Sequence, residues 1–316
     1  MNSRTSGKKS TSARRAKRKK KSVNPVLHPI QAWSTRWNKA GVAARTGMVA
    51  GTIVAILCVI AVLFTTIRYV DWSVRVSEAR SVQSELAAQY DFNPGNIISD
   101  GQFFNSNAMS ESEVQAFLDE QGAACTSQQC LRTMTFDTET QAADDLCSEY
   151  TGASAQTAAQ IINGAAKACG ISQKVLLTML QKEQHLVTAT SPSDFQFKSA
   201  MGLSCPDDAS CDPNYAGFFK QVYGAAKRYR YYLAHESNYG YHAGDLNFVQ
   251  YNPDSSCGGS TVFIENDATA LLYIYTPYQP NTAALRAGVG EGDSCSSYGN
   301  RNFSIIYDGW FGNPRE

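Results

Sequence analysis

The sequence predicts a mainly helical protein with little β-structure, stapled by disulfides and anchored to a membrane by one helix near its N-terminus. Three observations support this class. The twenty residues from Met48 to Ile67 carry no charge. Apolar residues recur at helical spacing after residue 154. Eight of the nine cysteines follow the uncharged stretch.

The uncharged stretch predicts a membrane-spanning helix. Twenty residues at about 1.5 Å each match a hydrocarbon core roughly 30 Å thick. Tyr69 and Trp72 follow, and such aromatics are typical of a membrane interface. The alternative is an uncleaved signal peptide, but the run is longer than a typical signal core and begins far from the N-terminus. We therefore expect residues 47–68 to form a transmembrane helix in contact with the lipid bilayer.

The charges are segregated along the chain. Residues 1–46 carry thirteen Lys or Arg and no acidic residue, and the first acidic residue is Asp71. This asymmetry predicts a disordered basic tail in the cytoplasm and an extracellular C-terminal part. The chain after Ile67 holds fifteen basic and twenty-eight acidic residues, so no nucleic-acid partner is expected for the ectodomain.

The cysteine pattern indicates an oxidising compartment. An even number of exported cysteines suggests up to four disulfides, although eight cysteines allow 105 pairings. Closeness in sequence favours two pairs and leaves the other four residues to form two more. No Cys-x-x-Cys or His-x-x-x-His pattern occurs, so no metal and no cofactor are expected. The favoured pairs are Cys125–Cys130, Cys205–Cys211, Cys147–Cys169 and Cys257–Cys295.

The exported part divides into three predicted segments. Residues 69–92 form a helical stalk, residues 93–150 a small disulfide-containing segment or wall-binding module, and residues 151–316 the main domain. Within the middle segment, Ser110-Glu-Ser-Glu113 is a capping box that predicts a helix from about 111 to 121. In the main domain we expect helices ending at Gly170 and beginning after Ser172, helices over 215–234, 267–273 and 301–311, and a strand over 261–265.

The helix after Ser172 places a carboxylate on its apolar stripe. Leu176, Leu180, Glu183 and Val187 are spaced by four, three and four residues, so they share one face. Partial desolvation there would raise the pKa of Glu183 and keep its proton available for acid catalysis. The structural alternative is a helix-end glutamate that pairs with Lys182 or Lys174.

Two segments carry a family resemblance. The string Gly170-ISQKVLLTMLQKEQ-His185, followed by Ser199-AMG-Leu203, resembles the catalytic core of the lysozyme-like superfamily, in the branch of goose-type lysozymes and soluble lytic transglycosylases. The same region is similar to exported actinobacterial wall proteins, some of which carry a haemagglutinin-like label. The resemblance covers roughly residues 150–280 and implies a lysozyme-like domain over 151–316. The chain differs from the family at two places. It has Glu183-Gln184 where Glu-Ser is usual, and its glycine loop continues into Leu203 where Met-Gln is usual.

The resemblance implies a catalytic Glu183 and a glycine loop beneath the substrate. Glycine permits close backbone approach by a ligand, and the glutamine and tyrosines of the following helix suit hydrogen bonding and stacking on sugars. A tyrosine late in the domain is implied near the substrate acetamido group. The candidate substrate contacts are Gln184, Ala200, Met201, Gly202, Gln221, Tyr275 and Tyr278.

These residues predict a membrane-anchored extracellular peptidoglycan-acting glycosidase, of lytic transglycosylase or muramidase type. Glu183 would protonate the oxygen between N-acetylmuramic acid and N-acetylglucosamine. A hydrolase needs a second carboxylate about 5–5.5 or 6.5–9.5 Å away, whereas a transglycosylase uses the substrate's own hydroxyl. The alternative is a non-catalytic carbohydrate- or cell-wall-binding or adhesin-type surface protein, whose partner would be peptidoglycan or another cell-surface glycan. The available second acids are Asp194, Asp207, Asp208 and Asp212.

Overall fold

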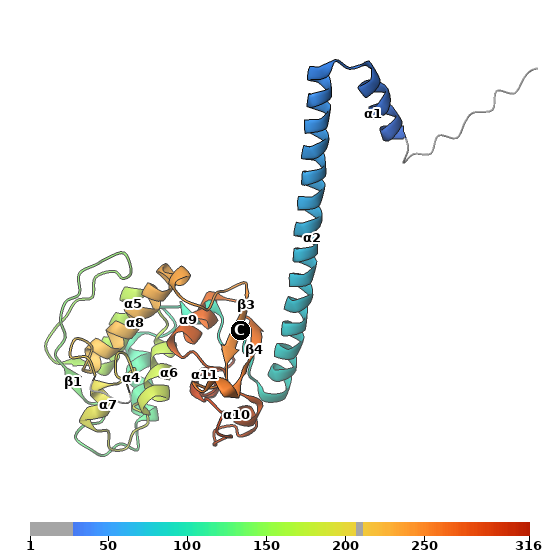
Figure 1. Ribbon diagram of the computed structural model, residues 1–316. Coiled ribbons are helices and arrows are strands. Elements are labelled where there is room, and N and C mark those ends of the chain that lie inside the picture. Colours follow the sequence, from blue (N-terminus) through green and yellow to red (C-terminus); the bar gives the residue numbers. More distant parts are fainter. Residues whose placement is uncertain (1–27, 207–210) are drawn as a thin grey trace, which may run out of the picture. The chain divides into compact units, whose positions relative to one another are not determined.

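The computed structural model describes residues 28–206 and 211–316, and the chain divides into two compact units, residues 1–71 and 72–316. The first unit contains α1 (His28–Lys39) and the N-terminal part of α2 (Val42–Tyr90) (Figure 1). The predicted disordered tail falls mostly on residues 1–27, outside the described part.

Helix α2 carries the predicted membrane segment. Among the described residues it is the one helix long and apolar enough to cross a membrane, and none of its most apolar stretch is buried by other parts of the protein. Large apolar side chains from Val49 to Val70 are exposed along it. Exposed apolar surface of this extent is unfavourable in water and matches a bilayer core. Together with the disulfides, this helix fits a membrane-anchored extracellular protein.

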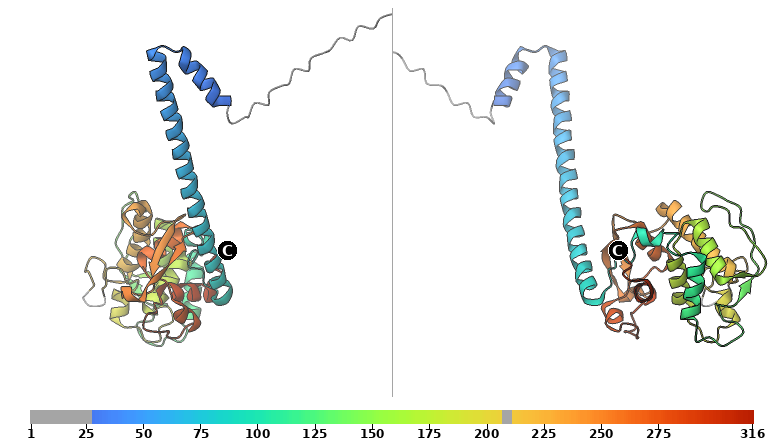
Figure 2. Two further views of the ribbon diagram at one scale, coloured as in Figure 1. Left: turned by 45° about the vertical axis from the view of Figure 1, so that its right-hand side comes forward. Right: turned by 180° about the vertical axis from the view of Figure 1, so that it is seen from behind.

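The second unit begins with the remainder of α2, which packs on a β-hairpin. Strands β3 (Leu246–Gln250) and β4 (Gly259–Phe263) are antiparallel, with Leu246 opposite Phe263. The amide of the buried Gln83 accepts from Phe263 N at 2.8 Å and donates to Phe263 O at 3.2 Å. Gln83 therefore satisfies the outer edge of β4, and the hairpin is visible from two further sides in Figure 2.

Helices are the main regular elements in the rest of this unit. The mainly helical class with little strand is confirmed. The elements are α3 (Asp100–Phe103), α4 (Glu111–Gln121), β1 (Thr135–Phe136), β2 (Gln156–Thr157), α5 (Ala158–Cys169), α6 (Gln173–Gln184), α7 (Asp194–Lys198), α8 (Phe218–Ala234), α9 (Asp267–Tyr275), α10 (Thr282–Arg286) and α11 (Gly299–Phe311), with short 3-10 turns at Glu236–Asn238 and Ser255–Cys257.

Local sequence signals fix several helix ends. The predicted capping box is confirmed: the Ser110 side chain accepts from Glu113 N, and the Glu113 carboxylate accepts from Ser110 N. Helix α5 ends at Gly170, whose φ of 65° lies in the left-handed region that glycine adopts without a Cβ penalty. The short connection that follows turns the chain directly into α6.

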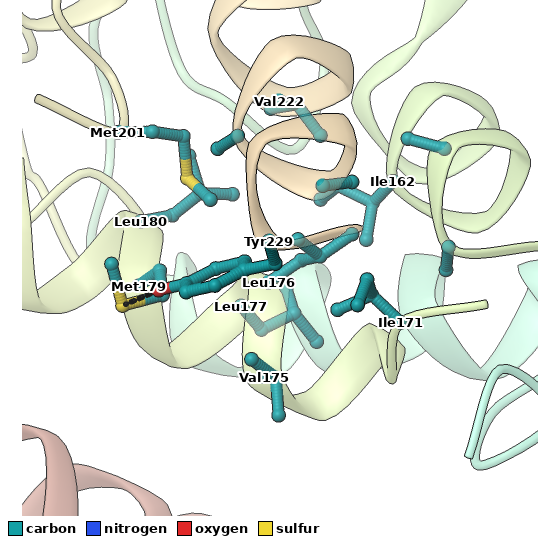
Figure 3. Packing of buried hydrophobic residues seen from close by; sticks show 14 of the residues in the cluster. Ile162, Ile171, Val175, Leu176, Leu177, Met179, Leu180, Met201, Val222 and Tyr229 are labelled. Carbon is teal, nitrogen blue, oxygen red and sulfur yellow. Dashed lines mark hydrogen bonds between the residues drawn. The ribbon is translucent and has the colours of Figure 1, made fainter. Parts of the chain in front are cut away.

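The core is formed where α5, α6 and α8 meet. Ile162, Leu176 and Val222 come from these three helices and are fully buried (Figure 3). Tyr229 of α8 reaches across, and its hydroxyl lies 3.5 Å from Met179 Sδ of α6. The residues before 151 share this core, because Ile97, Ile98, Phe103, Val114 and Leu118 belong to the same buried cluster.

Four disulfides staple this unit. They join Cys125 to Cys130, Cys147 to Cys169, Cys205 to Cys211 and Cys257 to Cys295. They include the two pairs that closeness in sequence favours and the two pairs expected from the remaining four cysteines. Cys58, within α2, is free and exposed.

The Cys147–Cys169 bond is expected to contribute substantially to stability. It ties the end of α5 to the preceding loop across 22 residues, and closing a loop of this length is worth about 3 kcal/mol in the chain-entropy account. Replacing both cysteines with serine should lower the free energy of unfolding by that amount, measured by near-UV circular dichroism in denaturant on the detergent-solubilised chain. The same double change at Cys125 and Cys130, which close a shorter loop, should cost less. An equal or larger loss at the short loop would contradict the loop-length argument.

Candidate active site at the end of helix α6

The stripe predicted for α6 leads from the core to a carboxylate at its edge. Leu176 and Leu180 are fully buried, and Val187 beyond the helix is 2 % exposed. The side chain of Glu183, between them, is 22 % exposed. The helix ends at Gln184, and His185 follows in the left-handed conformation. Glu183 therefore lies at the boundary between the core and the surface.

One carboxylate oxygen of Glu183 is held by its neighbour. Lys182 Nζ lies 2.5 Å from Glu183 Oε1, and the lysine side chain is only 5 % exposed. The same ammonium donates to Thr276 Oγ1 of the α9 C-terminus at 3.1 Å. A buried charge is costly unless it is paired. The structural alternative recognised in the sequence, a Glu183–Lys182 pair, is therefore present.

The other oxygen of Glu183 faces Gly202. A Cβ at Gly202 would stand 3.2 Å from Glu183 Oε2, and the φ of Gly202 is 70°. Both the backbone conformation and the close approach require glycine here. Within residues 28–206 and 211–316, Oε2 accepts no hydrogen bond. It is thus the oxygen available to a ligand or a proton.

The loop that carries Gly202 is held in place by Gln221. This α8 residue is fully buried. Its Oε1 accepts from Met201 N at 3.0 Å and Leu203 N at 3.1 Å, and its Nε2 donates at 2.8 Å to the carbonyl oxygens of Leu203 and Tyr215. Both ends of the amide are engaged, so Gln221 positions the loop, and its direct contact with a substrate stays a prediction.

Two tyrosines lie close to the carboxylate. The Tyr275 hydroxyl donates to Met201 O at 2.6 Å, and its ring stacks on that of Tyr229 at 5.1 Å. Burial raises the pKa of both hydroxyls well above the ordinary value of 10, and the charge of Glu183 raises each further. Both therefore remain protonated under any physiological condition and can only be neutral hydrogen-bonding groups.

The structure brings together only part of the set expected from the sequence. Glu183, Gly202, the Met201 backbone and Tyr275 meet around one carboxylate. The side chains of Ala200 and Met201 are fully buried, so a contact of these two residues with a substrate, which stays a prediction, would have to involve their backbone.

Two other candidates lie at the margin of the group. Gln184 is partly exposed, and its carbonyl oxygen accepts from Gln196 Nε2 at 2.8 Å. Tyr278 lies beside Tyr241, whose pKa is raised by burial and then by Tyr278.

Sequence reasoning missed Thr276 and Tyr229 as neighbours of Glu183. Tyr229 lies in an aromatic-rich helix at a spacing typical of core residues. No local sequence signal distinguishes it from the other aromatic residues of that helix. Thr276 lies one residue beyond α9. Its position next to Tyr275 is the only hint in the sequence that it approaches the site.

The possible second acids are placed differently. Asp194 opens α7 and accepts from Gln129 Nε2 at 2.6 Å, and Asp212 accepts from Asn214 N at 2.9 Å. Both carboxylates therefore accept hydrogen bonds from residues other than those around Glu183. Asp207 and Asp208 lie outside the described residues. In the part of the chain that is described, no group of three or more His, Cys, Asp or Glu is arranged to hold a metal ion.

The fold and the site together define a mainly helical, disulfide-stapled, membrane-anchored type of extracellular protein with a carboxylate-centred site. A family model described as "LasA, N-terminal domain" matches residues 96–316. The chain therefore belongs to this family. No curated protein and no solved structure matches the chain.

Proposed function

We propose that this protein is a membrane-anchored extracellular enzyme that cleaves the glycan strands of peptidoglycan, with Glu183 as the general acid. The observation that carries the proposal is the placement of its carboxylate. It ends the buried stripe of α6, and its free oxygen faces Gly202. A well-placed acid of this kind accelerates cleavage by about 10²–10⁴-fold.

The two oxygens of Glu183 would have different roles. Oε1 accepts from Lys182, so the proton for the glycosidic oxygen would be carried on Oε2. After the transfer, Lys182 would stabilise the carboxylate that remains. Tyr275 would keep the loop at Met201 in position while the substrate binds over Gly202.

The proposal includes the arrangement expected from the sequence. Residues 1–46 would lie in the cytoplasm, 47–68 would cross the bilayer, 69–92 would form a stalk, and the C-terminal part would be extracellular. A lysozyme-like fold over 151–316 is supported by the contact between the helix-end glutamate and the glycine loop nineteen positions later. The cell wall as target is supported by the family, since LasA is a staphylolytic peptidase.

A second candidate function is non-catalytic binding of the wall, as in an adhesin-type surface protein. The Lys182–Glu183 pair favours it, because a purely structural glutamate would make the same contact. A transglycosylase leaves anhydro sugar ends, a muramidase leaves reducing ends, and a binding protein leaves neither.

The test is to incubate the detergent-solubilised chain with purified peptidoglycan and analyse the released fragments by mass spectrometry. Anhydro ends would identify a transglycosylase, in which the substrate's own hydroxyl attacks and no second carboxylate is needed. Reducing ends would identify a hydrolase. Retention of the chain on peptidoglycan without any new ends would replace the catalytic proposal with the binding one, and absence of both would reject the wall as target.

A further inference from the structure

The outer face of α8 forms a cavity apart from the Glu183 carboxylate. Its volume is about 480 Å³. Gly224, Lys227, Arg228 and Tyr231 line it from one helical face, at spacings of three, one and three residues. Leu146, Tyr215 and Tyr239 complete its walls. We call this cavity the Arg228 pocket.

The absence of a side chain at Gly224 lets two residues pack closely on α8. A Cβ at this position would stand 2.8 Å from Leu203 Cδ2 and 3.5 Å from Tyr215 Cδ1. Leu203 follows Gly202 directly, so the loop beneath Glu183 packs against a helix position that also lines the pocket. The opposite face of α8, with Val222 and Tyr229, is buried in the core.

The pocket has more positive than negative charge. Lys227 forms an ion pair with Asp144, and the hydrogen bond from Lys227 lowers the pKa of that carboxyl to about 2. Arg228 forms no ion pair within the described residues. Its guanidinium carbon lies 5.7 Å from the Tyr215 ring and 6.0 Å from the Tyr232 ring. Its guanidinium donates to the Tyr215 hydroxyl at 3.4 Å and also to the Tyr232 hydroxyl, and a guanidinium has five N–H donors in all.

Aromatic rings surround this cation. Tyr231 stacks on His235 at 4.1 Å, and Tyr239 meets the edge of Tyr232 at 4.9 Å. Rings fixed in this way present flat surfaces with polar edges, which suit sugar rings and their hydroxyls. A planar guanidinium beside them matches the two oxygens of a carboxylate or phosphate.

The pocket is connected to the Glu183 site through ring contacts. Tyr232, whose ring lies beside the Arg228 guanidinium, meets Tyr229 edge-on at 6.5 Å, and Tyr229 stacks on Tyr275. The Tyr275 hydroxyl then bonds to Met201 O, beside Gly202. The charges of Glu183 and Arg228 both act on this hydroxyl, with opposite effects on its pKa. Glu183 and Arg228 therefore both lie within electrostatic reach of Tyr275.

We propose that the Arg228 pocket binds an oxyanion, a carboxylate or phosphate, carried on a cell-wall glycan. This inference rests on the proposed function for the class of ligand, and adds that the protein prefers charged over neutral chains. A wall glycan can carry such a group as the carboxylates of its peptide stems or as phosphate. Both would be bound by the same guanidinium.

The test measures binding by isothermal titration calorimetry on the detergent-solubilised chain. The probes are a neutral N-acetylglucosamine tetramer, a disaccharide–tetrapeptide with free carboxylates, and N-acetylglucosamine 6-phosphate. Exchange of Arg228 for Gln should weaken binding of the anionic probe by about 10- to 100-fold, the range for hydrogen bonds to a charged group. Binding of the neutral tetramer should stay unchanged. The matched control is Arg230→Gln on the same helix, which should change every affinity by less than about twofold.

The outcomes separate this inference from the proposed function. Tighter binding of the peptide or of the phosphate probe identifies the source of the oxyanion, and either supports the pocket. Equal affinities for neutral and anionic probes in the native protein, or equal effects of the Arg228 and Arg230 changes, would overturn it. A second variant, Arg228→Lys, keeps the positive charge but lacks the planar guanidinium. It controls for a loss of binding that comes from misfolding after removal of the charge. Release of sugar ends is measured separately. The proposed catalysis can therefore be rejected while the proposed binding pocket is supported, or the pocket can be rejected while catalysis is supported.

Discussion

Replacing Glu183 with Gln is expected to reduce release of glycan fragments from peptidoglycan by about 10²–10⁴-fold. The amide has the shape of the carboxyl group and can still accept from Lys182, but it has no acidic proton to transfer. Retention of the chain on peptidoglycan should persist, because the change leaves the surface of the site in place. The measurement is the initial rate of new sugar ends. Glu120→Gln on the exposed face of α4 is the matched control and should keep at least about half of the native rate.

The same substitution also tests the structural alternative, because it leaves Lys182 without a carboxylate. A 5 % exposed ammonium that loses its charged partner should lower the free energy of unfolding by about 2 kcal/mol. Adding Lys182→Met removes the unpaired charge, so the double variant should recover most of that stability. Its activity should not return. Full activity in the double variant would show that Glu183 serves only as a counter-ion.

Much of the framework around Glu183 follows from local sequence. The apolar stripe from Leu176 to Val187 predicts which face of α6 is buried, and Gly170 predicts where α5 ends. The capping box at Ser110 is a purely local signal and forms as expected. These features depend on residues a few positions apart, for which helical geometry alone decides which side chains meet.

The partners of Glu183 depend on tertiary packing. Lys182 is adjacent in sequence, and neighbouring residues on a helix do not usually face each other. Here Lys182 is buried because Thr276 and the start of α11 cover it. The sequence of α6 alone does not indicate that these residues cover Lys182.

Strand β3 escaped prediction for a related reason. Its buried positions are Asn247 and Val249, whereas the large apolar Phe248 is 61 % exposed. A polar residue is therefore buried and a large apolar residue is exposed, whereas the usual strand buries its apolar residues and exposes its polar ones. Asn247 is accommodated because its amide bonds to backbone groups of His242 and Asp245.

The largest loss of stability is expected for Gln221→Leu. Leucine fills a similar volume in the core, but it leaves the Met201 and Leu203 N–H groups and the Leu203 and Tyr215 carbonyl groups without their side-chain partner. A buried polar group that loses its hydrogen bond costs about 1–3 kcal/mol. Since these groups belong to one segment that can partly relax, we expect a total loss of about 3–5 kcal/mol in the free energy of unfolding, measured by denaturant titration.

Hydrogen exchange can show that this loss begins at the active-site loop. In the Gln221→Leu variant, the amides of Met201 and Leu203 should exchange faster, while those in the middle of α6 keep their protection until global unfolding. Lys220→Ala, at the neighbouring position on α8, should leave exchange in the loop unchanged. Because Gly202 lies between the two affected amides, the loop would no longer hold its close approach to Glu183. Glycan cleavage should therefore fall through displacement of the loop. Native exchange rates in this loop after the substitution would mean that Tyr275 and the Cys205–Cys211 disulfide suffice to position it.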